Sequence, residues 1–203
     1  MIDFFLNAYK NASQTQIILE AIAFVFGILS VWLAKKENIL VYPTGLISTI
    51  ITTYLLYQAE YFGDMTMNFY YSIMSVYGWY KWQSNNNQQE LEITRTNTKE
   101  KIIGFLMFIL TIIFTYMVYL FFDYKLEIPN YIDIFTSGIF FTAMWFMALK
   151  KIENWALWIL GDCIVVPLFV HRGLGMLALQ YLIFTILAIL AYIQWKKILA
   201  KKI

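Results

Sequence analysis

Residues 102–122 read IIGFLMFILTIIFTYMVYLFF, a run of 21 residues without a single charged side chain. A helix of about 20 apolar residues is long enough to cross the ~30 Å hydrocarbon core of a bilayer. Six further candidate spans lie between short charged or turn-forming segments, at residues 18–36, 39–58, 62–82, 131–149, 152–170 and 173–195. The sequence therefore predicts an all-α membrane protein with seven transmembrane helices.

The composition of the chain supports this class and excludes several others. Of 203 residues, 61% are hydrophobic and 14% are charged, with a mean hydropathy of +0.62, whereas soluble domains carry about 25% charged residues. A net charge of +2 provides no basic stripe for nucleic acid. One cysteine, Cys163, and one histidine, His171, exclude an internal disulfide and a paired-histidine metal site. Motifs for ATP binding or intramembrane hydrolysis are missing, so we expect neither enzyme activity nor a cofactor or metal.

Lys and Arg are distributed unevenly between the two sides of the predicted bundle. Twelve fall on one side and three on the other, namely Lys10, Lys125 and Arg172. The positive-inside rule then predicts a plasma-membrane protein, in bacteria the inner membrane, with its N-terminus outside and its C-terminus in the cytoplasm. Three segments lie outside the spans: an interfacial stretch at 1–17, a polar, flexible cytoplasmic linker at 83–101 and a basic tail at 196–203.

An internal repeat divides the chain into two three-helix units, 18–82 and 131–195, with a connecting helix at 102–122. Glu37-Asn38-x-x-x-Tyr42-x-x-Gly45 recurs as Glu153-Asn154-x-x-x-Trp158-x-x-Gly161, at an offset of 116. A fainter echo at an offset of 113 relates Trp82 to Trp195, each preceded four residues earlier by Gly78 or Ala191. This pattern predicts a 3+1+3 parallel repeat. Chance recurrence of Asn and aromatic residues in aromatic-rich helices is the alternative.

A candidate binding site centres on Asp162, near the middle of the sixth predicted span. Helical spacing places Asp162 on one face with Trp158 and either Asn154 or Trp155. A carboxylate beside indole rings suits a flat, cationic ring, which stacking and cation–π attraction would orient. In the alternative, the tryptophans form an interfacial belt and Asp162 bonds a neighbouring helix.

Polar residues in other spans extend this candidate site. Asn68, Tyr71 and Gln180 offer groups suited to an amide or a ribose hydroxyl, although hydrogen bonds between helices would use the same side chains. We expect most of Ser48, Thr49, Thr52 and Thr53 to bond their own helix.

Two further sets of residues suggest how a transporter would capture and move a cation. Acidic residues near the outer helix ends predict an outer mouth that concentrates cations: Glu20, Asp64 and Asp133. Residues that weaken or loosen a helix backbone are candidate hinges in the second helix of each unit: Pro43, Gly45, Gly161 and Pro167.

Several motifs resemble those of the PnuC family of bacterial vitamin transporters. The most specific are Tyr77-Gly78-Trp79-Tyr80-Lys81-Trp82 and Glu153-Asn154-Trp155-x-x-Trp158, and the similarity also covers Glu20-Ala21 and Asp133. The resemblance runs from about residue 18 to 196. It implies a fold like that of the SWEET sugar transporters, a homotrimer, and facilitated diffusion of nicotinamide riboside, a precursor of NAD. A cytoplasmic kinase would trap the riboside by phosphorylation.

The resemblance also implies roles for individual residues. Trp155 and Trp158 would stack near the nicotinamide ring, whereas Asn68 and Asp162 stand where the family pattern often has Gln and Asn. An acid at 162 and the shorter amide at 68 are also expected in the thiamine-transporting branch, so thiamine is the alternative substrate. A non-transporting assembly or receptor subunit, with a dry centre, is the alternative from another class.

Overall fold

The computed structural model describes residues 12–58, 62–83, 91–121 and 126–201 and contains helices in the number and order that the sequence predicts. Their ends differ from the predicted ones by a few residues, and within the described ranges the helices are α2 (Gln14–Lys35), α3 (Val41–Gln58), α4 (Phe62–Gln83), α5 (Thr98–Phe121), α6 (Ile128–Ala148), α7 (Glu153–His171) and α8 (Gly175–Ala200). Most of the predicted interfacial segment, residues 1–11, lies outside the described residues.

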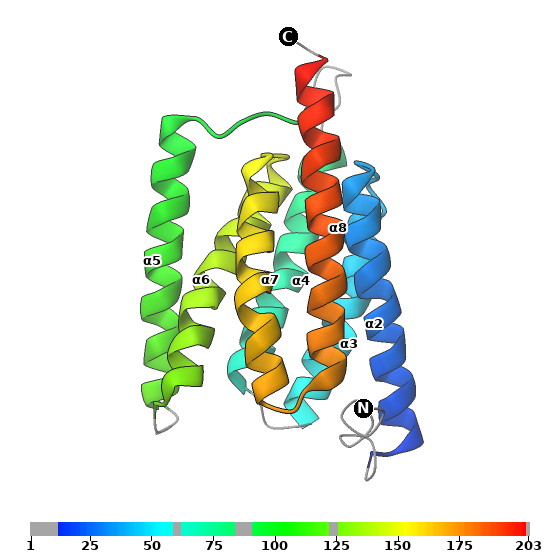
Figure 1. Cartoon of the computed structure of the whole chain (residues 1–203), viewed down its shortest axis with the longest axis vertical. Helices are drawn as coiled ribbons and strands as arrows, with labels where there is room; N and C mark the ends of the chain where they lie inside the picture. Colours follow the sequence, from blue (N-terminus) through cyan, green and yellow to red (C-terminus); the bar gives the residue numbers. More distant parts are fainter. Residues whose placement is uncertain (1–11, 59–61, 84–90, 122–125, 202–203) are drawn as a thin grey trace.

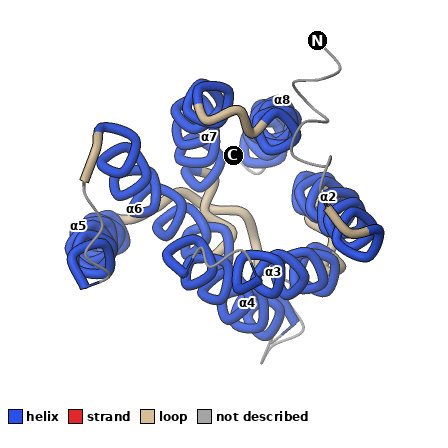
Figure 2. The backbone as a smooth tube through the Cα atoms, turned by 90° about the horizontal axis from the view of Figure 1, so that it is seen from below, coloured by secondary structure: helices blue, strands red, loops and turns tan. Residues whose placement is uncertain are grey.

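Six of the helices form a ring. Packing runs from α2 to α3, α4, α6, α7 and α8 and back to α2, whereas α5 lies outside the ring and packs mainly on α6 (Figure 2). Neighbouring helices in sequence run antiparallel, so α2 begins at one end of the bundle and α8 ends at the other (Figure 1). We call the end that carries Lys35, Lys81, Lys150 and Lys196 the basic end.

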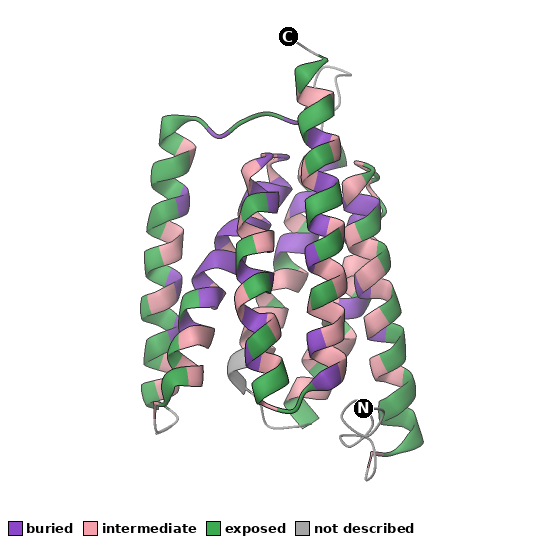
Figure 3. Ribbon diagram, in the orientation of Figure 1, coloured by how far each residue is buried: buried purple, intermediate pink, exposed green. Residues whose placement is uncertain are grey.

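Hydropathy and exposure follow from this arrangement. Among the described residues, α2, α5, α6, α7 and α8 are long and apolar enough to cross a membrane. α3 and α4 are more polar, because Ser, Thr, Asn and Tyr side chains on them face the interior of the ring. α5 exposes large apolar side chains on most of its surface, whereas α6 is the most buried span (Figure 3). Such exposed apolar surface is what a lipid environment requires.

Tightly packed aromatic residues close the ring at the basic end. Tyr42 meets Trp82 edge-to-face at 5.1 Å and 87° between rings, and Trp155 meets Trp195 at 5.4 Å and 88°. The side chains of Tyr42, Trp155 and Trp195 are at most 1% exposed. Lys150 Nζ lies 4.4 Å from the centre of the Trp82 ring and 3.4 Å from Glu37 Oε2, so a charged pair covers the aromatic core.

The turns after α2 and α6 have the same backbone geometry at an offset of 113. Glu37 and Lys150 both adopt positive φ, 56° and 50°. Glu37 N donates to Ala34 O as Lys150 N does to Met147 O, and the next residue donates to Leu33 O or Phe146 O. The two edge-to-face pairs are related by the same offset. The backbone geometry of the two units therefore matches at an offset of 113 residues, which relates Trp82 to Trp195. It does not match at the offset of 116 that relates the two Glu-Asn motifs, because the first motif begins before α3 and the second begins inside α7.

The predicted flexible linker at 83–101 is ordered in its second half, which corrects that expectation. Thr94 pairs with the turn between α6 and α7, since Thr94 N donates to Lys150 O and Ile152 N donates to Thr94 O. Ile93 is 1% exposed within the closed basic end. α5 already begins at Thr98, after an Asn97–Glu100 pair that caps its first turn. The polar composition of this segment gave no indication that it is anchored. Residues 84–90 lie outside the described residues.

Gly78→Ala tests the packing at the basic end. A Cβ at Gly78 would overlap the Tyr42 ring, which is itself 1% exposed. We expect the substitution to destabilise the protein by about 1–3 kcal/mol, the usual cost of overpacking, as a lower melting temperature in detergent. Val76→Ile on the same helix, at a 56% exposed position, is the control that should not change it. An unchanged melting temperature for Gly78→Ala would contradict the close packing of Tyr42.

Candidate functional site

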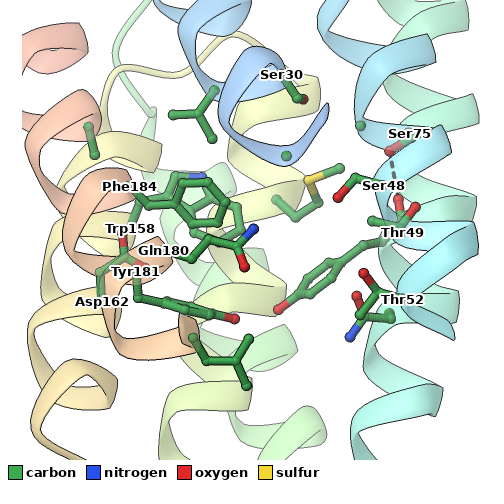
Figure 4. Close-up of a pocket in the computed structure, with 18 of the residues that line it drawn as sticks. Ser30, Ser48, Thr49, Thr52, Ser75, Trp158, Asp162, Gln180, Tyr181 and Phe184 are labelled. Atoms are coloured by element: carbon green, nitrogen blue, oxygen red, sulfur yellow. Dashed lines mark hydrogen bonds between the residues drawn. The ribbon is translucent and has the colours of Figure 1, made fainter. Parts of the chain in front are cut away.

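A cavity of about 710 Å³ lies inside the helix ring (Figure 4). It takes side chains from all six ring helices and from the end of α5, and its volume is typical of a small-molecule site. At the basic end its floor consists of Ala34, Tyr42 and Trp155, each at most 1% exposed. At the opposite end the lining continues to Asn130, near the start of α6, and to Arg172, just after α7. The cavity is therefore closed at the basic end and extends toward the opposite end.

One wall of the cavity is aromatic and consists of Trp158, Tyr71 and Tyr181, whereas Phe140 packs against two of these rings without lining the cavity. Trp158 stacks on Phe140, with ring centres 5.4 Å apart and planes at 26°, and Tyr71 lies 6.3 Å from Trp158. Tyr181 of α8 lies 6.0 Å from Phe140 and continues this wall (Figure 4). Gly161 makes room for the Phe140 ring, because a Cβ at position 161 would overlap that ring. The predicted role of Trp158 as a stacking residue is consistent with this position, and Gly161, a predicted hinge, packs closely against Phe140.

Asp162 lies beside this aromatic wall and lines the cavity. It is the tenth of the 19 residues of α7, about the middle of the span. Its side chain is 1% exposed, and neither carboxylate oxygen has a hydrogen-bond partner among the described residues. The alternative in which Asp162 bonds a neighbouring helix finds no support there. An ionisable group inside a membrane protein without such a partner is costly, which points to a ligand as its partner.

Amides and hydroxyls line the rest of the cavity. Asn68, Tyr71 and Gln180 are among the lining residues, as the sequence predicts. Gln180 extends over Gly27, where a Cβ would lie 3.0 Å from its Nε2 atom, and its amide has no hydrogen-bond partner in the described part of the chain. Hydroxyls also line it, those of Ser30, Ser48, Thr49, Thr52 and Ser75. Nothing in the sequence indicated Ser30, and we expected most of the α3 hydroxyls to bond their own helix. On α3 their helical spacing with Gly45 was an available signal.

The far end of the cavity differs from the predicted acidic mouth. Asp133 lines the cavity, but its carboxylate is paired, since Arg172 Nη2 lies 2.6 Å from Oδ2 and the Tyr119 hydroxyl donates to it at 3.4 Å. Glu20 does not line the cavity, and the side chain of Asp64 lies outside the described residues. The predicted role of Asp133 in attracting cations is therefore weakened, because Arg172, after α7, folds back onto α6 and pairs with it.

Two other predicted site residues, Asn154 and Trp155, pack at the closed basic end of the bundle. Asn154 is fully buried at the start of α7, donates to Lys151 O and does not line the cavity. Trp155 lies in the cavity floor against Trp195, so it is part of the closed basic end rather than of the aromatic wall.

Of the hinge candidates, Gly45 lines the cavity, with Ser30 Oγ 2.9 Å from where its Cβ would be. Pro43 falls in the first turn of α3, where a missing N–H removes little, whereas Pro167 lies inside α7 and removes a helix hydrogen bond.

This chain is similar to known proteins over nearly its whole length. The family model described as nicotinamide mononucleotide transporter matches residues 17–197. Two relatives named nicotinamide riboside transporter PnuC, from Escherichia coli (strain K12) and Shigella flexneri, are each 24% identical over 201 residues, which cover 87% of this chain and 84% of each relative. A solved structure, the crystal structure of the vitamin B3 transporter PnuC, matches with a TM-score of 0.73 and 21% identity over 98% of this chain and 89% of the solved chain. With a family match over residues 17–197 and, in the described part of the chain, five apolar helices long enough to span a membrane, this chain is a multi-pass membrane protein that belongs to the nicotinamide mononucleotide transporter family.

Proposed function

We propose that this protein imports nicotinamide riboside, with the flat cationic ring held between the aromatic wall and Asp162. The observation that carries the proposal is a mid-span carboxylate, 1% exposed and without a hydrogen-bond partner among the described residues, beside the stacked rings of Trp158 and Phe140. A cationic ring compensates that charge, and the lining rings of Trp158, Tyr71 and Tyr181 offer it stacking and cation–π contact. The names of the bacterial relatives support the riboside as the substrate.

The architecture that fits this function is a SWEET-like 3+1+3 parallel repeat. The offset of 113 relates α2, α3 and α4 to α6, α7 and α8, and it also relates the positive-φ turns and the two edge-to-face pairs. The two units are then α2–α4 and α6–α8, with α5 as the connecting helix. Glu37 and Lys150 occupy matching positions and meet as an ion pair where the units join.

Transport would proceed by alternating access without ion coupling. Rocking of one three-helix unit against the other would expose the cavity to each side in turn, with the present conformation closed at the basic end. By the positive-inside rule the basic end faces the cytoplasm, the N-terminus lies outside, and the protein resides in the bacterial inner membrane. By family resemblance the protein forms a homotrimer, and a cytoplasmic kinase traps the riboside.

The unphosphorylated riboside suits the cavity better than the mononucleotide. Of the described lining residues, three carry formal charges, namely Asp133, Asp162 and Arg172. Arg172 is already paired with Asp133 at 2.6 Å, so the cavity offers no uncompensated cation to a phosphate.

Thiamine is the second candidate substrate, because it too presents a flat cation that the Asp162 carboxyl group can pair with. A non-transporting assembly subunit is a weaker candidate. Its dry centre is at odds with a cavity of about 710 Å³ lined by amides, hydroxyls and a carboxylate.

Ligand-induced thermal stabilisation of the purified protein tests the substrate. A ligand that binds the native state raises stability by RT ln(1 + [L]/Kd), so nicotinamide riboside should raise the melting temperature more than nicotinamide mononucleotide. Thiamine is measured in parallel. A shift with thiamine alone would replace the substrate, and no shift with any of the three would remove the support for vitamin binding. Uptake by proteoliposomes without an ion gradient then tests facilitated diffusion.

A further inference from the structure

We propose that a hydroxyl face on α3, formed by Ser48, Thr49 and Thr52, binds the sugar of the substrate and selects ligands with a polyhydroxylated group on the cationic ring. This inference rests on the proposed function. Asp162 and Trp158 recognise the cationic ring of the riboside, and the α3 hydroxyl face would recognise its sugar.

The α3 hydroxyl face follows the geometry of one helix. Ser48, Thr49 and Thr52 line the cavity together with Gly45, one turn earlier, and Leu56, one turn later, a helical spacing of three and four residues. In Figure 4 these hydroxyls project from one side of the cavity, and Trp158, Asp162 and Tyr181 come from the other side. A ligand that spans the cavity therefore meets a charged aromatic wall at one end and hydroxyls at the other.

Hydrogen bonds already made by these hydroxyls determine what they offer to a ligand. Ser48 Oγ donates to Ala23 O at 2.8 Å. Thr49 Oγ1 donates to Leu46 O at 3.3 Å and accepts a hydrogen bond from Ser72 at 2.8 Å. Because their protons are used, Ser48 and Thr49 present only lone pairs to the cavity. A sugar hydroxyl can donate to such oxygens.

Thr52 differs from its neighbours. Its hydroxyl has no hydrogen-bond partner among the described residues, although hydroxyls inside helices usually bond back to a carbonyl one turn earlier. Thr53, the next residue, does so, with Oγ1 2.7 Å from Thr49 O, and does not line the cavity. Thr52 therefore retains both a donor and an acceptor for a ligand. A sugar hydroxyl that has left bulk water needs such partners. Of the three hydroxyls, Thr52 is the one whose loss should be most visible.

Thr52→Val, which replaces the hydroxyl by a methyl group of similar size, tests the inference. Affinities for nicotinamide riboside and for 1-methylnicotinamide, which has the same cationic ring without the sugar, are measured on purified wild-type and variant proteins. We expect Thr52→Val to weaken riboside binding about tenfold, as the loss of one or two neutral hydrogen bonds does. Binding of 1-methylnicotinamide should be unchanged, and Thr52→Ser should restore riboside affinity.

Thr53→Val is the matched control on the same helix and should leave both affinities unchanged. The sugar assignment is overturned if Thr52→Val weakens both ligands equally, or if it leaves riboside affinity intact. Melting temperatures without ligand establish that each variant is folded. Failure of wild-type protein to bind the riboside would instead overturn the proposed function, and the sugar assignment with it.

Discussion

Asp162→Asn should weaken binding of a cationic ligand about 100-fold and should not lower the melting temperature of the ligand-free protein. The two expectations have one cause. In the empty cavity the carboxylate is 1% exposed without a hydrogen-bond partner among the described residues, and a neutral amide costs less to bury there. With a cation bound, the same carboxylate contributes attraction in a medium of low dielectric constant, for which about 2.7 kcal/mol is a moderate value.

A pair of ligands that differ only in charge separates this effect from shape. The 1,4-dihydro form of the riboside has nearly the same outline but a neutral ring, so Asp162→Asn should leave its affinity within a fewfold of the wild-type value. Glu20→Gln is the control variant, because it also removes one carboxylate but at a position that does not line the cavity. Equal losses for the cationic and neutral ligands would contradict a charge-recognition role for Asp162.

The second large effect is expected from Gly161→Ala, which should lower stability by about 1–3 kcal/mol and weaken ligand binding. The added Cβ would overlap the Phe140 ring, which is 6% exposed and stacks on Trp158. In a close-packed interior the ring cannot move without displacing its neighbours. The displaced Phe140 ring supports Trp158, which lines the cavity, so stability and affinity should fall together. Thermal melting and equilibrium binding measure the two changes.

Phe140→Leu in the Gly161→Ala background distinguishes packing from hinge motion. A smaller side chain at 140 relieves the overlap, so the double variant should be more stable than the two single effects added together predict. If Gly161 acts as a hinge, as the sequence suggested, transport by the double variant should stay low while its stability recovers. Additive losses without recovery would contradict the packing role of Gly161.

Much of the fold was predictable because the bilayer imposes it. A lipid environment requires each span to satisfy its own backbone hydrogen bonds, so an apolar run of about 20 residues becomes a helix whatever its neighbours are. The predicted span at 152–170, for example, differs from α7 (Glu153–His171) by one residue at each end. Anchoring of residues 91–97 was not predictable, because it depends on the turn between α6 and α7, more than 50 residues away in sequence.

Site residues were predictable where a polar side chain lies within a membrane-spanning segment, because such side chains are uncommon there. Asp162, Gln180 and Asn68 stand out in apolar spans, and all three line the cavity. Asn154 belongs to the same motif as Trp158, yet it is buried in the first turn of α7, because position along the helix decides whether a side chain reaches the cavity or the closed end. Thr52 and Thr53 are identical residues in one helix, and only Thr52 lines the cavity.

The sequence by itself determined the membrane class, the number and order of the helices and the polar residues available to a ligand, since these depend on local hydropathy and residue type. Tertiary structure decided which of those residues have partners. Asp133 is paired because Arg172 folds back onto it, Asp162 faces the cavity without one among the described residues, and Gly161 makes room for Phe140. Those differences come from contacts between separate helices, whose geometry is set by packing around the ring rather than by any one segment.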